Sequence, residues 1–301
     1  MKMNIKIVFC LLSLFAIISQ GCSHNNTSND KKSITVSLEP QKYFLDKIVG
    51  DKINVNCLLK SSSNPESYEP SINDLLALEK SLAYIKMGNV GFEQSLIDKI
   101  KQNNNKIIIF DSSLGIEPIM GTHDCGHHHE HDHAHHNEAS VDPHTWTSIK
   151  NAKIIARNMF DAVVKIDSVN KDFYKSNYDN LISSLDSLDN YATQKLAPHK
   201  GKAFLVWHPS LSYFARDYNL EQITLGQIGK ELSAKQLQEQ IDNARKHNAS
   251  TFFFQKEYDS QQANVLNEQI GAKITTINPL NYEWEKEIRL IIDAIASTKN
   301  D

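Results

Sequence analysis

The chain has 301 residues and a formal net charge of −4, from 32 basic and 36 acidic side chains. This length is sufficient for two lobes of ordinary size. The mild acidity, without a stripe of Lys or Arg, argues against nucleic acid as a partner. Loss of residues 1–21 would remove Lys2 and Lys6 and no acid, which leaves 30 basic against 36 acidic residues.

The N-terminus has the pattern of an export signal followed by a lipidation site. A basic start, MKMNIK, precedes the short apolar run IVFCLLSLFAII and then SQGC. That run is too short to span a membrane comfortably. Because SQGC resembles a bacterial lipobox, we expect a signal peptide over residues 1–21, a lipid on Cys22, and an unstructured polar tether over residues 22–32. A cleaved secretory peptide without a lipid is the alternative.

Two cysteines remain once Cys10 leaves with the signal and Cys22 carries the lipid, namely Cys57 and Cys125. These two could form a disulfide in an oxidising compartment. Cys125 could equally bind a metal, and the sequence leaves both alternatives open.

The residues from 34 to 110 alternate between predicted strands and helices. This order of strand, helix and strand indicates parallel pairing, with helices on the faces of the sheet. The predicted strands cover residues 34–38, 52–59, 83–88 and 106–110, and the predicted helices cover residues 43–50, 71–81 and 92–102.

Eight of the thirteen histidines lie in residues 123–136, HDCGHHHEHDHAHH. No hydrophobic residue larger than alanine interrupts this run, so it cannot pack as a core element. Neutral imidazole is a common ligand for borderline metals near pH 7. We therefore predict a loop over residues 121–138 that captures metal weakly, with a merely solvated polar loop as the alternative. The histidines are His123, His127, His128, His129, His131, His133, His135 and His136.

The second half repeats the alternation after a helix from about Ser148 and a much longer helix over residues 172–196. Strands are predicted over residues 202–207, 222–225, 251–255 and 272–277, and helices over residues 210–218, 233–247, 261–271 and 284–298. We expect an α/β fold with two similar lobes, residues 33–168 and 198–301, whose mostly parallel sheets are flanked by helices. A single long connecting helix over residues 169–197 would join them.

Three polar residues outside the histidine-rich run are candidate ligands. Glu66 follows a predicted strand, and His208 directly follows the strand that ends at Val206, so both lie where open α/β sheets place ligands. His144 lies at the entrance to a helix. A proline is adjacent to each of them, which stiffens the local backbone. One carboxylate and two imidazoles form a set used for zinc with an open fourth position.

Long segments of the chain resemble the zinc/manganese solute-binding lipoproteins of bacterial ABC importers. They are SNPESYEPSINDL, VDPHTWTSIKNAKIIARNM, FLVWHPSLSYFARDYNLEQI, GKELSAKQLQEQI and GAKITTINPL. The resemblance implies two α/β lobes joined by one long helix, with the metal in the cleft between them. A histidine-rich loop between the first two segments is typical of the zinc-directed members.

By position, His144 and His208 match metal-binding histidines of that family. The first family ligand is usually a histidine, and this chain departs from the pattern with Glu66, which we retain as a ligand because carboxylates bind zinc. A late family carboxylate is replaced by Asn278, so water, Asn278 or a loop histidine would complete the shell. Asp142 is expected to support His144 from outside the shell.

Three further residues are expected to act structurally. Tyr68 and Trp146 should pack the walls of the cleft, and Arg216 should form an ion pair away from the metal.

The resemblance implies an extracytoplasmic protein, not an enzyme, that captures Zn²⁺ and delivers it to an ABC permease and its ATPase. Two imidazoles favour zinc over manganese. Such a protein would be a monomer held at a bacterial membrane by its lipid. Alternatives are a zinc-dependent hydrolase, which the absence of an HExxH motif disfavours, and a surface adhesin or metal-storage lipoprotein.

Overall fold

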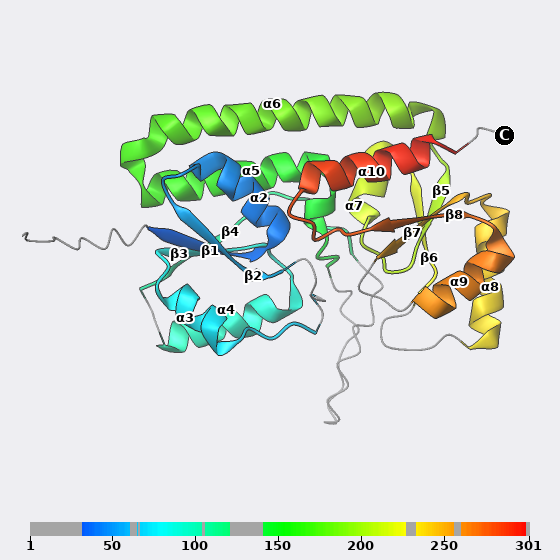
Figure 1. The fold of residues 1–301 in the computed structure, drawn as a ribbon, viewed down its shortest axis with the longest axis horizontal. Helices are drawn as coiled ribbons and strands as arrows, with labels where there is room; N and C mark the ends of the chain where they lie inside the picture. The colour runs from blue at the N-terminus through cyan, green and yellow to red at the C-terminus, as the bar shows by residue number, and fades with distance from the viewer. Residues whose placement is uncertain are drawn as a thin grey trace, which may run out of the picture. The chain divides into compact units, whose positions relative to one another are not determined.

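Two four-stranded sheets, one in each half of the chain, organise the structure (Figure 1). The computed structural model describes residues 32–60, 65, 67–103, 106–120, 141–226, 233–255 and 260–298. The first sheet contains β1 (Ser33–Leu38), β2 (Asn54–Leu59), β3 (Ala83–Lys86) and β4 (Ile108–Asp111). The second contains β5 (Ala203–Val206), β6 (Glu221–Thr224), β7 (Thr251–Gln255) and β8 (Lys273–Ile277).

Both sheets are parallel and have the same topology. The strand order is β2-β1-β3-β4 in the first sheet and β6-β5-β7-β8 in the second. In the first, Val36 of β1 pairs with Cys57 of β2 on one side and with Ile85 of β3 on the other. Strand order therefore reverses at β1 and at β5, and the carboxyl ends of these strands are where open α/β sheets bind ligands.

Helices cover both faces of each sheet (Figure 1). The first lobe has α2 (Glu39–Val49), α3 (Ile72–Glu79), α4 (Gly91–Asn103) and α5 (Ile149–Ile166). The second has α7 (Ser212–Tyr218), α8 (Ala234–Lys246), α9 (Ser260–Ile270) and α10 (Trp284–Ala296). The helix α6 (Lys171–Leu196) connects the two lobes in sequence. It has 26 residues and contacts α2, α5 and α10. The predicted fold class, two parallel-sheet lobes joined by one long helix, is confirmed.

The spacing of apolar residues explains how α6 packs. Its buried residues Leu181, Leu185, Leu188, Ala192 and Leu196 recur at three and four positions, which places them on one face of the helix. That face lies against α5 and α10, so a single rigid element packs on both lobes.

One continuous cluster of buried apolar side chains extends through both lobes. It includes Val36 of β1, Phe44 of α2, Leu185 of α6, Val206 of β5 and Trp284 of α10. The rings of Phe44 and Trp284 meet edge to face with their centroids 4.9 Å apart. Because these contacts cross from one sheet's helices to the other's, the lobes share a hydrophobic core.

The second sheet also has a core of its own. Leu205 and Trp207 point to the side covered by α8 and α9, whereas Phe204 and Val206 point into the shared core. This alternation follows from the two-residue period of a strand. It shows why β5 is apolar throughout, since both of its faces are buried.

The first helix begins earlier than predicted. It starts at Glu39, where the sequence suggested residue 43, because Pro40 fits the first turn of a helix and needs no donor there. The helix ends as predicted at Gly50, whose φ of 56° favours glycine.

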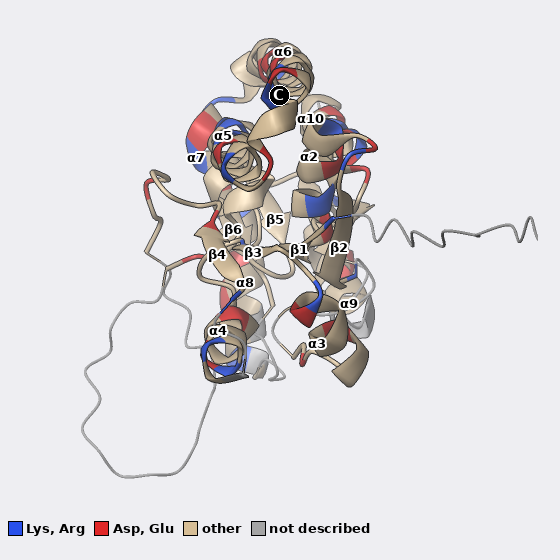
Figure 2. Cartoon of the chain, turned by 90° about the vertical axis from the view of Figure 1, so that its left-hand side faces the viewer, with Lys and Arg blue, Asp and Glu red and all other residues tan. Residues whose placement is uncertain are grey.

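Several predicted features lie outside the described residues. They are the signal segment with Cys22, the tether, and the histidine-rich loop. Within the described ranges, no helix is both long and apolar enough to cross a membrane. Acidic and basic side chains are interspersed over the described elements, as Figure 2 shows, which agrees with the mild net charge.

Candidate metal centre

His208 lies at the carboxyl end of β5, where the strand order of the second sheet reverses. Gln255, at the end of β7, fixes its backbone from the neighbouring strand. The His208 N–H donates to Gln255 Oε1 at 3.2 Å, and Gln255 Nε2 donates to the His208 carbonyl at 2.7 Å. Gln255 is fully buried and His208 is 6% exposed, so the imidazole is held at a fixed place near the end of the sheet.

His144 arrives from the segment that precedes α5. It directly precedes a short 3₁₀ helix, η1 (Thr145–Thr147), and is 6% exposed. The carboxylate of Asp142 accepts two hydrogen bonds from it on the same oxygen, from the backbone N–H at 2.9 Å and from ring Nδ1 at 2.8 Å. The prediction that Asp142 supports His144 is confirmed.

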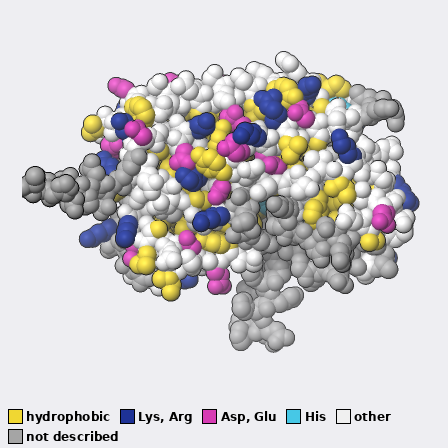
Figure 3. All heavy atoms as spheres, viewed as in Figure 1, with side chains coloured by type: hydrophobic (Ala, Val, Ile, Leu, Met, Phe, Trp, Pro, Cys, Tyr) yellow, Lys and Arg dark blue, Asp and Glu magenta, His cyan; other side chains and the backbone are white. Residues whose placement is uncertain are grey.

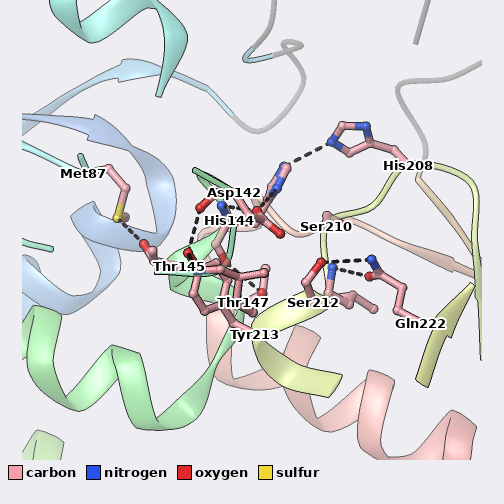
Figure 4. Close-up of polar contacts among 12 residues, drawn as sticks. Met87, Asp142, His144, Thr145, Thr147, His208, Ser210, Ser212, Tyr213 and Gln222 are labelled. Atoms are coloured by element: carbon pink, nitrogen blue, oxygen red, sulfur yellow. Dashed lines mark hydrogen bonds and ion pairs between the residues drawn. The ribbon is translucent and has the colours of Figure 1, made fainter. Parts of the chain in front are cut away.

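The two histidines face each other (Figure 4). Their Nε2 atoms are 3.1 Å apart, and their ring planes are inclined by 72°. Because Asp142 accepts from Nδ1 of His144, a neutral His144 has its lone pair on Nε2. We therefore assign the donor in this contact to the Nε2–H of His208.

Electrostatics favour an ionised Asp142. Burial would raise its pKa, but hydrogen bonds and positive potential from His144, together with a hydrogen bond from Ser212, hold the pKa below its ordinary value. A buried carboxylate that remains ionised orients the His144 ring and increases the basicity of Nε2.

Two tryptophans tie His144 to the second lobe. Trp146 is 1% exposed, and its Nε1–H donates to the carbonyl of Pro279 at 2.9 Å. The Nε1–H of Trp284 in turn donates to the Trp146 carbonyl at 2.8 Å. Trp146 is therefore buried, and its indole anchors the segment after β8 by a hydrogen bond.

The first lobe meets the same segment through a buried polar cluster. Thr145 donates to Met87 Sδ at 3.5 Å, and the Met87 N–H donates to the buried Glu93 carboxylate at 2.6 Å. Ser37, at the end of β1, also donates to Glu93. Burial raises the pKa of Glu93, against the opposing effect of these hydrogen bonds. The segment around His144 is thus in contact with both sheets.

Of the other predicted site residues, the structure describes Asn278. Glu66 and the eight loop histidines lie outside the described residues. Asn278 uses its side-chain oxygen to accept the N–H of Leu280 at 3.0 Å, a local turn that competes with metal binding. Across the described ranges, no three His, Cys, Asp or Glu side chains gather closely enough to hold a metal.

Tyr68 and Arg216 contact residues other than the two histidines. Tyr68 packs edge to face on Phe92, and its hydroxyl donates to the Leu58 carbonyl at 3.0 Å. Arg216 forms an ion pair with Asp217 at 3.1 Å, as predicted. Figure 3 shows only small traces of histidine on the visible described surface, which agrees with the burial of the pair.

The sequence did not predict the roles of Gln255 and Tyr213. Gln255 ends an apolar strand, and a buried amide at a strand end is a signal that could have identified it. Tyr213 lies close to His208 in sequence but has the pattern of an ordinary helical residue. Only the fold brings it to Asp142.

Comparison with known proteins finds relatives along nearly the whole described chain. Residues 34–296 match the family model described as "Zinc-uptake complex component A periplasmic" (ZnuA). The high-affinity zinc uptake system protein ZnuA of Bacillus subtilis is 26% identical over 283 residues, which are 91% of this chain and 88% of that protein. A crystal structure of ZnuA is 33% identical, with a TM-score of 0.79, over 89% of this chain and 99% of that one.

The zinc-binding lipoprotein AdcA of Streptococcus pneumoniae is 27% identical over 296 residues. The match covers 94% of this chain and 57% of AdcA, so the chain spans little more than half of that relative's length.

NMR can determine the tautomer of His144 directly. In metal-free protein near pH 8, long-range ¹H–¹⁵N NMR is expected to show His144 protonated on Nδ1 and unprotonated on Nε2, because the ionised Asp142 accepts from Nδ1. A proton on Nε2 of His144 would contradict the assignment. The Asp142→Asn variant serves as the comparison, since it removes the charged acceptor.

Proposed function

We propose, from the premise that this chain belongs to the zinc-uptake complex component A family, that it captures Zn²⁺ outside the cytoplasmic membrane and delivers it to an ABC permease. That family consists of uptake components, not enzymes. An ATPase would drive the transport, and zinc is the cargo of the protein. The family's description as periplasmic supports a place outside the cytoplasm.

The spacing of the two histidines carries this proposal. Two Zn–N bonds of about 2.0–2.1 Å at a tetrahedral angle place the nitrogens about 3.3–3.4 Å apart. In the structure the Nε2 atoms of His144 and His208 are 3.1 Å apart. A zinc ion therefore fits between them after a shift of a few tenths of an ångström, and their existing hydrogen bond is replaced by two coordinate bonds.

Binding requires a proton to move at one ring only. His144 already has its lone pair on Nε2, whereas His208 donates from Nε2 and must change tautomer before it coordinates. The ionised Asp142 stabilises the positive charge that the metal brings to His144. Two imidazoles favour zinc over manganese, which prefers oxygen ligands.

Glu66 is the third ligand in this proposal. It lies between Pro65 and Ser67, and Tyr68 nearby is hydrogen-bonded to the carbonyl of Leu58 in β2. A carboxylate from this segment would add one negative charge to the shell. Water or a loop histidine completes the shell better than Asn278, whose side-chain oxygen already accepts from Leu280.

The histidine-rich loop and the N-terminus would serve capture and localisation. Eight imidazoles between His123 and His136 would raise the local zinc concentration through weak binding. A lipid on Cys22 would hold the protein, as a monomer, at the membrane beside its permease. The shared core and the single linking helix support a small adjustment of the lobes on loading, not a wide hinge motion.

His144→Ala and His208→Ala are each expected to lose tight zinc binding while the protein stays folded. Removal of one ligand of three weakens a site by several orders of magnitude, since zinc–ligand bonds supply most of the binding energy. Isothermal titration with zinc measures the affinity, and circular dichroism checks the fold. A folded variant that keeps an affinity within about tenfold of wild type, where one ligand's loss predicts far more, would refute the assignment.

Deletion of residues 123–136 is expected to remove several weak zinc sites and to leave one tight site. Each weak binding event must restrict the conformations of the polypeptide that carries the ligands, and this entropy cost keeps its affinity low. The weak sites should also disappear on acidification through about pH 6.5, because protonated imidazole does not coordinate. Zinc titration of both proteins at neutral and mildly acidic pH provides the measurement. Loss of the tight site on deletion would show that the loop supplies an essential ligand.

A further inference from the structure

The short helix α7 begins four residues after His208 and contacts the segment that carries His144 (Figure 4). Its second residue, Tyr213, donates from its hydroxyl to the backbone carbonyl of Asp142, the residue that orients His144. One stretch of chain therefore carries one histidine of the pair and contacts the support of the other.

Tyr213 fixes the backbone of Asp142. Its hydroxyl donates to the Asp142 carbonyl at 2.8 Å and accepts the N–H of Ile119 at 3.1 Å. Asp142 N–H also donates to the Ile119 carbonyl at 2.8 Å. The Tyr213 side chain is fully buried, and the guanidinium of Arg216 lies 5.1 Å from its ring centroid. The hydroxyl thus joins two segments that are far apart in sequence.

We propose that Tyr213 is a positioning residue for metal capture, which holds the backbone of Asp142 and through it sets the orientation of the His144 ring. This inference rests on the proposed function, because it assumes that His144 and His208 bind the metal. Tyr213 fixes the Asp142 carbonyl, and Ile119 contacts both the Tyr213 hydroxyl and the Asp142 N–H, so the carboxylate extends to His144 from a restrained backbone. The second lobe then determines the geometry of both histidines.

Zinc titration of single variants tests the proposal. Tyr213→Phe is expected to raise the zinc Kd about 10-fold, the lower end of the effect of losing an outer partner of a metal ligand. With Co²⁺ as the probe, the visible absorption of Tyr213→Phe should differ from wild type, because a rotated imidazole changes the ligand field.

Tyr218→Phe is the matched control. Tyr218 lies on the same helix, is buried, and donates one hydrogen bond from its hydroxyl to Asp189 of α6 at 2.8 Å. It should lower the melting temperature but leave the zinc Kd and the Co²⁺ spectrum unchanged. An equal loss of zinc affinity in Tyr218→Phe would overturn the proposal in favour of a general effect on stability.

A double-mutant cycle separates positioning through Asp142 from any other route. In an Asp142→Asn background, Tyr213→Phe should raise the Kd by much less than it does alone, because both changes act on His144 through residue 142. Full additivity, or an unchanged Kd in folded Tyr213→Phe, would overturn the inference. His144→Ala is titrated in parallel: if it too retains zinc, the failure lies with the proposed metal site and not with α7.

Discussion

The hydrogen bond between His144 Nδ1 and the Asp142 carboxylate determines which ring nitrogen faces His208. With Nδ1 protonated, the lone pair on Nε2 points at the other imidazole, 3.1 Å away. If Asp142 were neutral or displaced, His144 could rotate or adopt the other tautomer, and the pair would no longer present two nitrogens to a metal. The surrounding contacts of Trp146, Thr145 and Tyr213 all restrain this one arrangement.

The fold provides that restraint from two directions. His208 and its Gln255 clamp belong to the carboxyl edge of the second sheet, whereas His144 lies on a segment that touches both sheets and the start of α10. Because α6 and the shared core join the lobes, the distance between the histidines is a property of the whole packed structure. A site preformed in this way loses little conformational entropy when zinc binds.

Sequence patterns were sufficient to locate the helices and strands and to suggest His144 and His208 as ligands. Periodicity located the strands and α6, and the placement of His208 after an apolar strand pointed to a ligand position. They were not sufficient for the supporting contacts, because Gln255 lies 47 positions from His208 and Tyr213 lies 71 positions from Asp142. Those pairs meet only through strand order and lobe packing. Nor did an apolar helix face reveal that Phe44 and Trp284 would share one core.

A crystal structure of the zinc-loaded protein, with anomalous data at the zinc edge, tests the central claim most directly. The account predicts one strong peak bonded to Nε2 of His144 and Nε2 of His208 at about 2.0–2.1 Å, with a Glu66 carboxylate oxygen at about 2.0–2.2 Å and Nδ1 of His144 still bonded to Asp142. A zinc ion bound away from these two histidines, or a Glu66 side chain turned away with another ligand in its place, would contradict it.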